Sequence, residues 1–489
     1  MHACGGSVWP MEFYGTAPSH DLTYSDVFLV PSRSGIRSRL DVSLATGDGS
    51  GATIPVVAAN MNSVTGPRLA ATLARRGGIA VLPQDAPLQE LDAAIRDVKS
   101  QSPQFDTPYV QSPDATVADA LVDLPPFAGH GVVLEDEGGA FVGTILAERL
   151  ATALPDARLG DLVHGGHPSL DADDVDSPRR AFDLMVDADL EFAPVLRHGR
   201  VVGTLSRRSA LRGTVYEPNV DRDGRLRVAA AIGVNGDVEA KARALAAAGV
   251  DVLVVDTAHG HQEGMIRAVR IVRDLDLGLP IVAGNIVTSD GVADLVDAGA
   301  DILKVGVGPG AMCTTRMMTA VGRPQFSAVL ETAEAARKLG AHVWADGGVR
   351  YPRDVALALA AGAASVMIGS WFAGTIEAPG VLRTDASGKL YKESWGMAST
   401  KAVRERFGRL SPYELARREL FAEGISSSAI YLDPLRPSIE DLLDMITSGV
   451  RSSFTYAGAS TLAEFHERAL VGLQSAAGYE EGKALPVSW

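Results

Sequence analysis

The sequence predicts an α/β protein built on a (β/α)8 barrel. Eight short apolar runs of strand length recur along the chain, and most are followed by a segment with the periodicity of an amphipathic helix. Such alternation is typical of a parallel sheet, and eight repeats favour closure into a barrel. An open doubly wound sheet is the alternative, but the chain lacks the strand-linked G-x-G-x-x-G with a downstream acidic residue that often marks that fold.

Each expected strand is a short, mainly apolar run. The eight runs are Ile54–Met61, Gly78–Pro83, Arg227–Val234, Asp251–Thr257, Pro280–Val287, Ile302–Gly308, His342–Val349 and Ser365–Gly369. Helices are expected over Asp237–Gly249, which has alanines on its packing face, and over Pro324–Gly340 and Pro352–Gly362. Aromatic residues are sparse, at 6% of the chain, and the abundant Ala and Gly suit close packing of helices on strands.

Polar and glycine-rich residues gather where six of these strands end. They are Asn60-Met61-Asn62, Asp256-Thr257, Gly284-Asn285, Gly306–Cys313, Asp346–Gly348 and Gly369-Ser370. The carboxyl ends of barrel strands meet on one face, and enzymes of this architecture place their chemistry there. The sequence therefore predicts that these segments converge on one site.

The strand series is interrupted between about Gln104 and Val215 by a weak internal repeat. In each copy a helical segment precedes two strand-like runs. These runs are Val132-Val133-Leu134 and Phe141–Leu146 in the first copy, and Ala193–Leu196 and Val201–Ser206 in the second. The expected division is a catalytic barrel of residues 1–104 and 216–489 with an inserted paired module of residues 105–215.

Two later segments break the barrel pattern. The stretch of about 382–435 is polar, rich in Arg and Glu and poorly periodic, which is typical of a mobile flap beside a barrel mouth. From Ala457 onward the pattern favours a helix followed by a loose end.

Composition narrows the range of partners and compartments. The net charge is −15, from 45 Lys and Arg against 60 Asp and Glu, so no nucleic-acid partner is expected. The two cysteines, Cys4 and Cys313, cannot form a disulfide framework, which favours a reducing cytoplasm. The chain has no apolar span of 18 residues and no basic-then-apolar leader, so no membrane association is expected.

Cys313 is the candidate nucleophile. It stands in a glycine-rich loop directly after an expected strand. A thiolate there could attack an electrophile, and the neighbouring glycines are suited to hold a nucleotide phosphate with backbone N–H groups. A small buried core residue is the alternative interpretation, because free cysteine is often buried.

Several motifs resemble the IMP dehydrogenase/GMP reductase family. They are Leu22–Val27, Gly308–Arg316 with the pattern G-P-G-x-x-C-T-T-R, Ala345–Tyr351, Ala373–Gly380 and Gly396-Met397. The inserted segment resembles the tandem CBS (Bateman) module that many members carry at this point. The resemblance implies a TIM barrel, GMP or IMP as the nucleotide, and a nicotinamide cofactor.

The resemblance also implies roles for individual residues. Cys313 would add to C2 of the purine, with Thr315 and Glu377 as a relay that protonates the leaving ammonia. The substrate would be bound by Asp346, Gly347, Gly348, Gly369, Ser370, Gly396, Met397 and Glu423. The cofactor would contact Asp256, Thr257, Ala258, Asn285, Gly306 and Gly308. The carbonyls of Gly308, Gly310 and Cys313 resemble the family's potassium site.

Two reactions are open on this scaffold. A dehydrogenase passes hydride from IMP to NAD and hydrolyses the intermediate to XMP, whereas a reductase releases ammonia from GMP and takes hydride from NADPH. Dehydrogenases carry an Arg-Tyr pair shortly before a Glu-Gly or Gln-Gly dipeptide of the flap. Here Glu423-Gly424 follows Arg417–Ala422, which lacks that pair, so the reductase branch is favoured.

Other positions favour the reductase in some cases and the dehydrogenase in others, so alternatives stay open. Ala58–Met61 and Phe454–Gly458 are reductase-like, whereas Asp256–His261 is closer to bacterial dehydrogenases. A dehydrogenase with a rearranged flap, or a weakly catalytic paralogue that senses purine nucleotides, would also fit.

The inserted module implies a regulatory ATP or GTP site. Arg149 and Ser209 stand where the ribose-binding aspartates of such modules are expected, so a structural or assembly role is the alternative. A homotetramer or octamer is the implied assembly.

Overall fold

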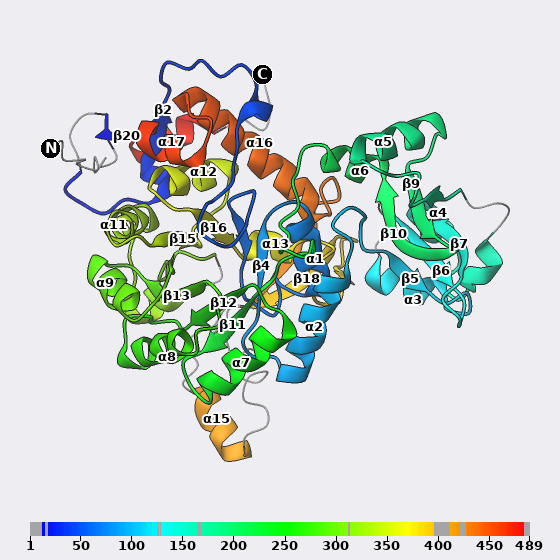
Figure 1. The fold of residues 1–489 in the computed structure, drawn as a ribbon, viewed down its shortest axis with the longest axis horizontal. Coiled ribbons are helices and arrows are strands. Elements are labelled where there is room, and N and C mark those ends of the chain that lie inside the picture. The colour runs from blue at the N-terminus through cyan, green and yellow to red at the C-terminus, as the bar shows by residue number, and fades with distance from the viewer. Residues whose placement is uncertain are drawn as a thin grey trace.

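A closed eight-stranded parallel barrel forms the body of the protein (Figure 1). The computed structural model describes residues 12–483 except 15–17, 125, 126, 128, 164–167, 312, 396–410 and 421–426. The barrel order is β11-β12-β13-β14-β15-β16-β3-β4. Its strands are β3 (Val56–Ala58), β4 (Ile79–Leu82), β11 (Ala229–Gly233), β12 (Val252–Asp256), β13 (Ile281–Ile286), β14 (Ile302–Val305), β15 (His342–Asp346) and β16 (Ser365–Ile368). All eight predicted strands are confirmed, each shorter than its predicted run.

Helices surround the barrel on its outer side (Figure 1). They include α1 (Pro67–Arg75), α2 (Leu88–Ser100), α7 (Val238–Ala248), α8 (Glu263–Asp274), α9 (Ser289–Asp297), α11 (Gln325–Lys338) and α12 (Pro352–Ala360). The Asp237 carboxylate caps α7 by accepting a 2.9 Å hydrogen bond from Ala240 N, and Gly249 ends it with a φ of +97°. Among the described residues, we find no helix that is both long and apolar enough to cross a membrane.

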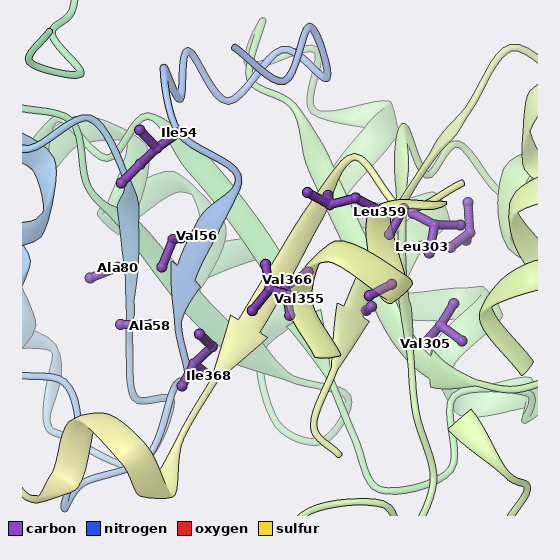
Figure 2. Packing of buried hydrophobic residues seen from close by; sticks show 14 of the residues in the cluster. Ile54, Val56, Ala58, Ala80, Leu303, Val305, Val355, Leu359, Val366 and Ile368 are labelled. Carbon is purple, nitrogen blue, oxygen red and sulfur yellow. The ribbon is translucent and has the colours of Figure 1, made fainter. Parts of the chain in front are cut away.

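Alternating side chains of the strands build two apolar layers. Val57 of β3 points into the barrel interior with Trp344 and Met367. Its neighbours Val56 and Ala58 instead belong to the layer between strands and helices, part of which Figure 2 shows. Successive side chains of a strand face opposite ways, so one short aliphatic run supplies both layers.

The inserted segment lies outside the barrel as two small sheets of the same build (Figure 1). In each sheet the middle strand is parallel to a short strand and antiparallel to its hairpin partner. The strands are β5 (Tyr109–Gln111), β6 (Gly131–Glu135) and β7 (Phe141–Leu146) in one sheet, and β8 (Leu170–Asp171), β9 (Phe192–Arg197) and β10 (Arg200–Ser206) in the other. The helices are α3 (Val117–Asp123), α4 (Ala147–Thr152), α5 (Pro178–Asp187) and α6 (Arg207–Gly213). The predicted internal repeat corresponds to these two units.

The polar stretch predicted to be a flap contains a further three-stranded sheet. It is formed by β17 (Arg383–Thr384), β18 (Leu390–Trp395) and β19 (Ser427–Tyr431), and α15 (Pro412–Leu420) lies between the last two strands in sequence.

The C-terminal part of the described chain is more ordered than the sequence indicated. A 19-residue helix that was not predicted, α16 (Ile439–Ala457), precedes α17 (Leu462–Arg468). The expected loose end is wrong where β20 (Leu470–Leu473) pairs with β1 (Glu12–Phe13) and β2 (Val27–Val30). The last described helix is α18 (Ala476–Glu481).

Candidate active site

A cavity of about 400 Å³ opens at the carboxyl ends of the barrel strands. All six strand ends singled out by the sequence contribute to its walls. The predicted site residues that line it are Asp256, Thr257, Ala258, Asn285, Gly306, Gly308, Gly310, Cys313, Thr315, Asp346, Gly347, Gly348, Gly369 and Ser370. The barrel thus brings together residues that are far apart in the sequence.

Cys313 lies on the wall of this cavity, in the loop that follows β14. Its side chain is exposed, so the interpretation as a buried core residue is wrong. Its Sγ donates to Thr315 Oγ1 at 3.3 Å, and its backbone N–H donates to Gly310 O at 3.0 Å. The loop therefore presents a thiol and a hydroxyl side by side to the cavity.

Glycines allow this loop to lie close to its neighbours. Gly306 has a φ of +150°, and a Cβ there would lie 2.2 Å from the backbone oxygen of Asp346. Gly308 has a φ of +81°, and a Cβ there would lie 2.2 Å from Cγ of Arg316. Any other residue at either position would displace the loop and with it Cys313.

A second glycine-rich wall faces the same cavity. Gly347 and Gly348 follow β15 with φ values of +88° and +81°, and Gly369 and Ser370 follow β16. A Cβ on Gly347 would lie 3.2 Å from Gly310 N, so the turn after β15 packs directly on the cysteine loop. Backbone held this close to a cavity is suited to contact an anionic group of a ligand.

Lys304 of β14 is a charged cavity residue that the sequence interpretation missed. The residue is 3% exposed. Its Nζ lies 2.8 Å from Asp256 Oδ1 and 2.9 Å from Asp346 Oδ2. It also donates to Asn285 Oδ1. Burial lowers the pKa of Lys304, but the two carboxylates outweigh that effect and hold the pKa above its ordinary value. The ammonium is therefore charged in the neutral pH range.

Two amides fix the carboxylates on either side of this lysine. Asn60 Nδ2 donates to Asp256 Oδ2 at 2.8 Å. Asn285 Nδ2 donates to Asp346 Oδ2 at 2.9 Å and to the carbonyl of Gly306 at 2.7 Å. Asp256 and Asp346 thus face the cavity as oriented hydrogen-bond acceptors.

Comparisons with known proteins agree with this geometry. A profile of the IMP dehydrogenase / GMP reductase domain matches residues 21–484. The chain belongs to that family. It is 55% identical over 476 residues to GMP reductase of Mycobacterium tuberculosis strain H37Rv, covering 97% of this chain and 99% of that protein. Inosine-5'-monophosphate dehydrogenase of Staphylococcus aureus strain MW2 is 34% identical over 482 residues, covering 97% and 96%.

Solved structures of family members have the same overall arrangement. A cysteine-to-alanine variant of GMP reductase from Trypanosoma brucei, in complex with guanosine 5'-monophosphate, aligns with a TM-score of 0.68 at 31% identity. The alignment covers 97% of this chain and 99% of that one.

Glu377 does not line the cavity that contains Cys313. Its carboxylate accepts hydrogen bonds from Ser438 Oγ at 2.5 Å and from Ile439 N at 2.9 Å, at the start of α16. It lines a separate cavity of about 330 Å³ together with Lys392. Burial raises the pKa of Glu377. The predicted relay partners Thr315 and Glu377 are therefore not joined in this conformation.

The remaining predicted substrate residues are Gly396, Met397 and Glu423, and they lie outside the described residues. They belong to the segments that flank β18 and β19.

The residues present fit a ligand that offers hydrogen-bond donors. Gln84 Oε1 is buried on the cavity wall without a hydrogen-bond partner in the described part of the chain. Sequence reasoning also missed this residue, although its place directly after β4 was a signal. Asp256 and Asn285 line the same cavity. A carboxamide or hydroxyl group of a ligand could therefore donate hydrogen bonds to these side chains.

The proposed cation ligands lie on one loop. Gly308, Gly310 and Cys313 all border the cavity, and the Gly310 carbonyl uses one lone pair for Cys313 N. Backbone oxygens of this kind suit a hard monovalent cation rather than a transition metal. Within the described residues no cluster of three His, Cys, Asp or Glu side chains could hold a metal ion.

Proposed function

We propose that this protein is a GMP reductase that converts GMP to IMP and ammonia with NADPH. The observation that carries the proposal is the 55% identity to a GMP reductase along 97% of the chain, against 34% for the dehydrogenases. The missing Arg-Tyr pair before Glu423-Gly424 points the same way. The exposed Cys313 beside Thr315 supplies the chemistry.

In the proposed reaction the Cys313 thiolate forms a bond to C2 of GMP. The exocyclic amine takes up a proton and leaves as ammonia, which breaks its bond to C2. The chemistry that a reduced nicotinamide would supply when bound is the hydride that replaces the amine at C2. The C2–Sγ bond then breaks and returns the thiolate. Thr315 Oγ1 lies 3.3 Å from Sγ and would pass a proton to the leaving amine.

We propose that substrate recognition uses the two walls described above. The Asp346 carboxylate would accept hydrogen bonds from the ribose hydroxyls. The backbone of Gly347, Gly348, Gly369 and Ser370 would contact the 5′-phosphate, with Gly396, Met397 and Glu423 closing the site from the flap. Asp256, Thr257, Ala258 and Asn285, with Gly306 and Gly308, would hold the nicotinamide end of the cofactor. Potassium would bind to the carbonyls of Gly308, Gly310 and Cys313.

A catalytic role for Glu377 requires a movement. Its carboxylate must leave Ser438 and Ile439 before it can approach Thr315. Glu377→Gln tests the assignment because it keeps a similar shape but cannot carry a proton as a carboxyl does. A large fall in kcat with unchanged thermal stability would support the relay. A lower melting temperature with nearly unchanged kcat would instead assign Glu377 to anchoring α16.

The proposed setting is the cytoplasm, with a homotetramer or octamer as the assembly.

We propose a CBS module for residues 105–215, with ATP or GTP as its regulatory ligand. In its second half, Ser209 is 2% exposed and its hydroxyl accepts from Ser206 N at 2.9 Å in a helix cap. That arrangement favours the first half, where Arg149 occupies the equivalent position, as the place for a nucleotide. Calorimetric titration of the protein with ATP and GTP tests this.

One pair of assays tests the proposed reaction. Purified protein is incubated with GMP plus NADPH, and separately with IMP plus NAD, while absorbance of the reduced cofactor is followed. Loss of NADPH with formation of IMP and ammonia is expected. Formation of NADH and XMP from IMP would overturn the proposal in favour of the dehydrogenase. Binding of purine nucleotides without turnover in either assay would favour the sensing role.

A further inference from the structure

We propose that Lys304 is a positioning residue that serves the nucleotide and cofactor subsites together, as the shared counter-ion of Asp346 and Asp256. The inference rests on the proposed function, because it assigns Asp346 to the nucleotide and Asp256 to the cofactor. It adds that both subsites depend on one buried ammonium that need not touch either ligand.

The strand register places Lys304 between the two carboxylates. Asp256 of β12 pairs with Gly284 of β13, and Gly284 pairs with Lys304 of β14. These three residues therefore lie side by side across adjacent strands. Asp346 is at the end of β15, the strand on the other side of β14. The lysine can reach acidic groups two strands away on one side and one strand away on the other.

Gly284 makes room for the lysine to cross β13. A Cβ at this position would lie 2.7 Å from Cβ of Lys304 and 2.3 Å from its backbone oxygen. Any side chain there would push Lys304 away from Asp256. The absence of a side chain at this one position is thus a structural requirement of the contact between Lys304 and Asp256.

The charges around Lys304 explain what it does. The charged groups with which it pairs are Asp256 from β12 and Asp346 from β15, while β13 contributes the neutral Asn285. The neutral Asn60, after β3, holds the far oxygen of Asp256. The ammonium lies within hydrogen-bonding distance of both carboxylates and offsets their mutual repulsion. Without the ammonium the two carboxylates would repel each other, and this repulsion favours the uptake of a proton by one of them.

Lys304→Met removes the charge and keeps most of the apolar stem. We expect the KM for GMP and the KM for NADPH to rise together by at least about tenfold, because both carboxylates lose the ion pair that orients them. We also expect a dependence of KM on pH beyond that of the wild type. KM should rise more steeply as pH falls, because a protonated aspartate is a poorer acceptor for ribose hydroxyls. The wild-type profile is the reference, because the phosphates of GMP and NADPH also titrate, with a second pKa of about 6.

A double variant separates this role from a structural one. In Lys304→Met/Asp256→Asn the Asp346 carboxylate has no charged neighbour left to repel it. The pH profile of the KM for GMP should therefore return to that of the wild type, while the KM for NADPH stays high. Lys338→Met is the matched control, since Lys338 is exposed on α11 and pairs with Glu334 at 2.7 Å. Its kinetics should equal those of the wild type.

The outcomes are distinct. The inference is overturned if Lys304→Met keeps both KM values within twofold of wild type. It is also overturned if the double variant folds, as judged by circular dichroism and melting temperature, yet keeps the altered pH profile. If the wild-type protein does not oxidise NADPH with GMP, the proposed function itself fails. The role of Lys304 is then tested by the pH dependence of GMP binding in a calorimeter, with the same expected profiles.

Discussion

The molecule contains two networks of buried ion pairs. One is built on a lysine ammonium and borders the cavity, whereas the other is built on arginine guanidinium groups and is enclosed by protein groups. The cavity network consists of Lys304, Asp256 and Asp346 with the amides of Asn60 and Asn285. The junction network lies where α16 meets α1 and the inserted segment. It consists of Arg76, Asp106, Arg208, Arg212, Glu440, Asp441 and Asp444.

The junction network is closed by protein groups. Arg212 of α6 bonds Glu440 at 3.0 Å and Asp441 at 2.6 Å, and Arg76 bonds the other oxygen of Glu440 at 2.6 Å. The planar guanidinium can bond several carboxylates at once, which fits a connection between three parts of the chain. Each of the network's four carboxylates pairs with at least one arginine of the protein, so we infer that the network attaches the inserted segment to the barrel.

The cavity network is open on one side. Its single ammonium is a compact charge between two carboxylates, and both carboxylates border the cavity. Burial of an ion pair therefore does not by itself reveal its purpose. Changes in the cavity network should alter kinetics, whereas changes in the junction network should alter stability.

The largest expected effect lies in the cavity but outside both networks. Cys313→Ala should reduce turnover by at least about 10³-fold, because no covalent intermediate can form. Its melting temperature should match the wild type, since the side chain is exposed and its only polar contact with the described residues is with Thr315. Steady-state kinetics and calorimetric binding of GMP provide the measurement. Appreciable residual turnover with intact GMP binding would refute covalent catalysis.

The junction network should give the next largest effect. Arg212→Met removes one of the two arginine partners of Glu440 and of Asp441, which keep Arg76 and Arg208 respectively. We expect this loss of charge-assisted hydrogen bonds to lower the free energy of unfolding by about 1.5–3 kcal/mol. Thermal unfolding followed by circular dichroism measures the loss. The KM for GMP at 25 °C should stay near wild type, because no cavity residue is touched.

A surface arginine of the same segment is the control for that variant. Arg179 forms an exposed pair with Asp183 on α5, and Arg179→Met should change stability by less than about 1 kcal/mol. If Arg212→Met is as stable as Arg179→Met, the junction network does not attach the inserted segment.

Asp346→Asn is expected to have a smaller and purely kinetic effect. The amide keeps the shape but weakens a charge-assisted hydrogen bond to the ribose, so the KM for GMP should rise roughly 10- to 100-fold. Stability should change little, because Lys304 keeps Asp256 as a counter-ion. Equal increases in the KM values for GMP and NADPH would contradict the assignment of Asp346 to the nucleotide alone.

The contrast between the networks also indicates what sequence could predict. The eight strands were predicted because each is a compact aliphatic run between polar ends, and the site followed from the rule for barrel faces. Lys304 was missed because it lies within the apolar run of β14. A lysine in a buried strand was itself a signal, since buried lysines need a counter-ion. Its partners, however, are known only once the register brings β12 and β15 beside β14.

The contacts of Glu377 and of the junction network could not be predicted from the sequence, for a related reason. The motif around Glu377 resembles the family, but its contacts depend on α16, a helix that was not predicted. Ser438 and Asp441 form a capping box at its start, and this S-x-x-D spacing was the available signal. The motifs indicated which residue types matter. The partners of those residues could be identified only from the packing of segments that are distant in the sequence.

The smallest expected effect is a pH dependence that should separate the two networks. Burial raises the pKa of Glu440, but Arg76 and Arg212 outweigh it and lower the pKa to about 2. A carboxyl with a depressed pKa in the folded state contributes stability above its ordinary pKa near 4.5, and this is lost as pH falls toward 2. The wild-type melting temperature should therefore fall over that interval.

Variants of the two networks should differ in that slope. Arg212→Met should lose less stability between pH 4.5 and about 3 than the wild type, because Glu440 then lacks one of the arginines that depress its pKa. Asp346→Asn should keep the wild-type slope, since it leaves the junction network intact. Melting curves of the three proteins across this range decide the matter. Parallel slopes for all three would mean that acid acts on other carboxyls and that the junction network contributes no pH-dependent stability.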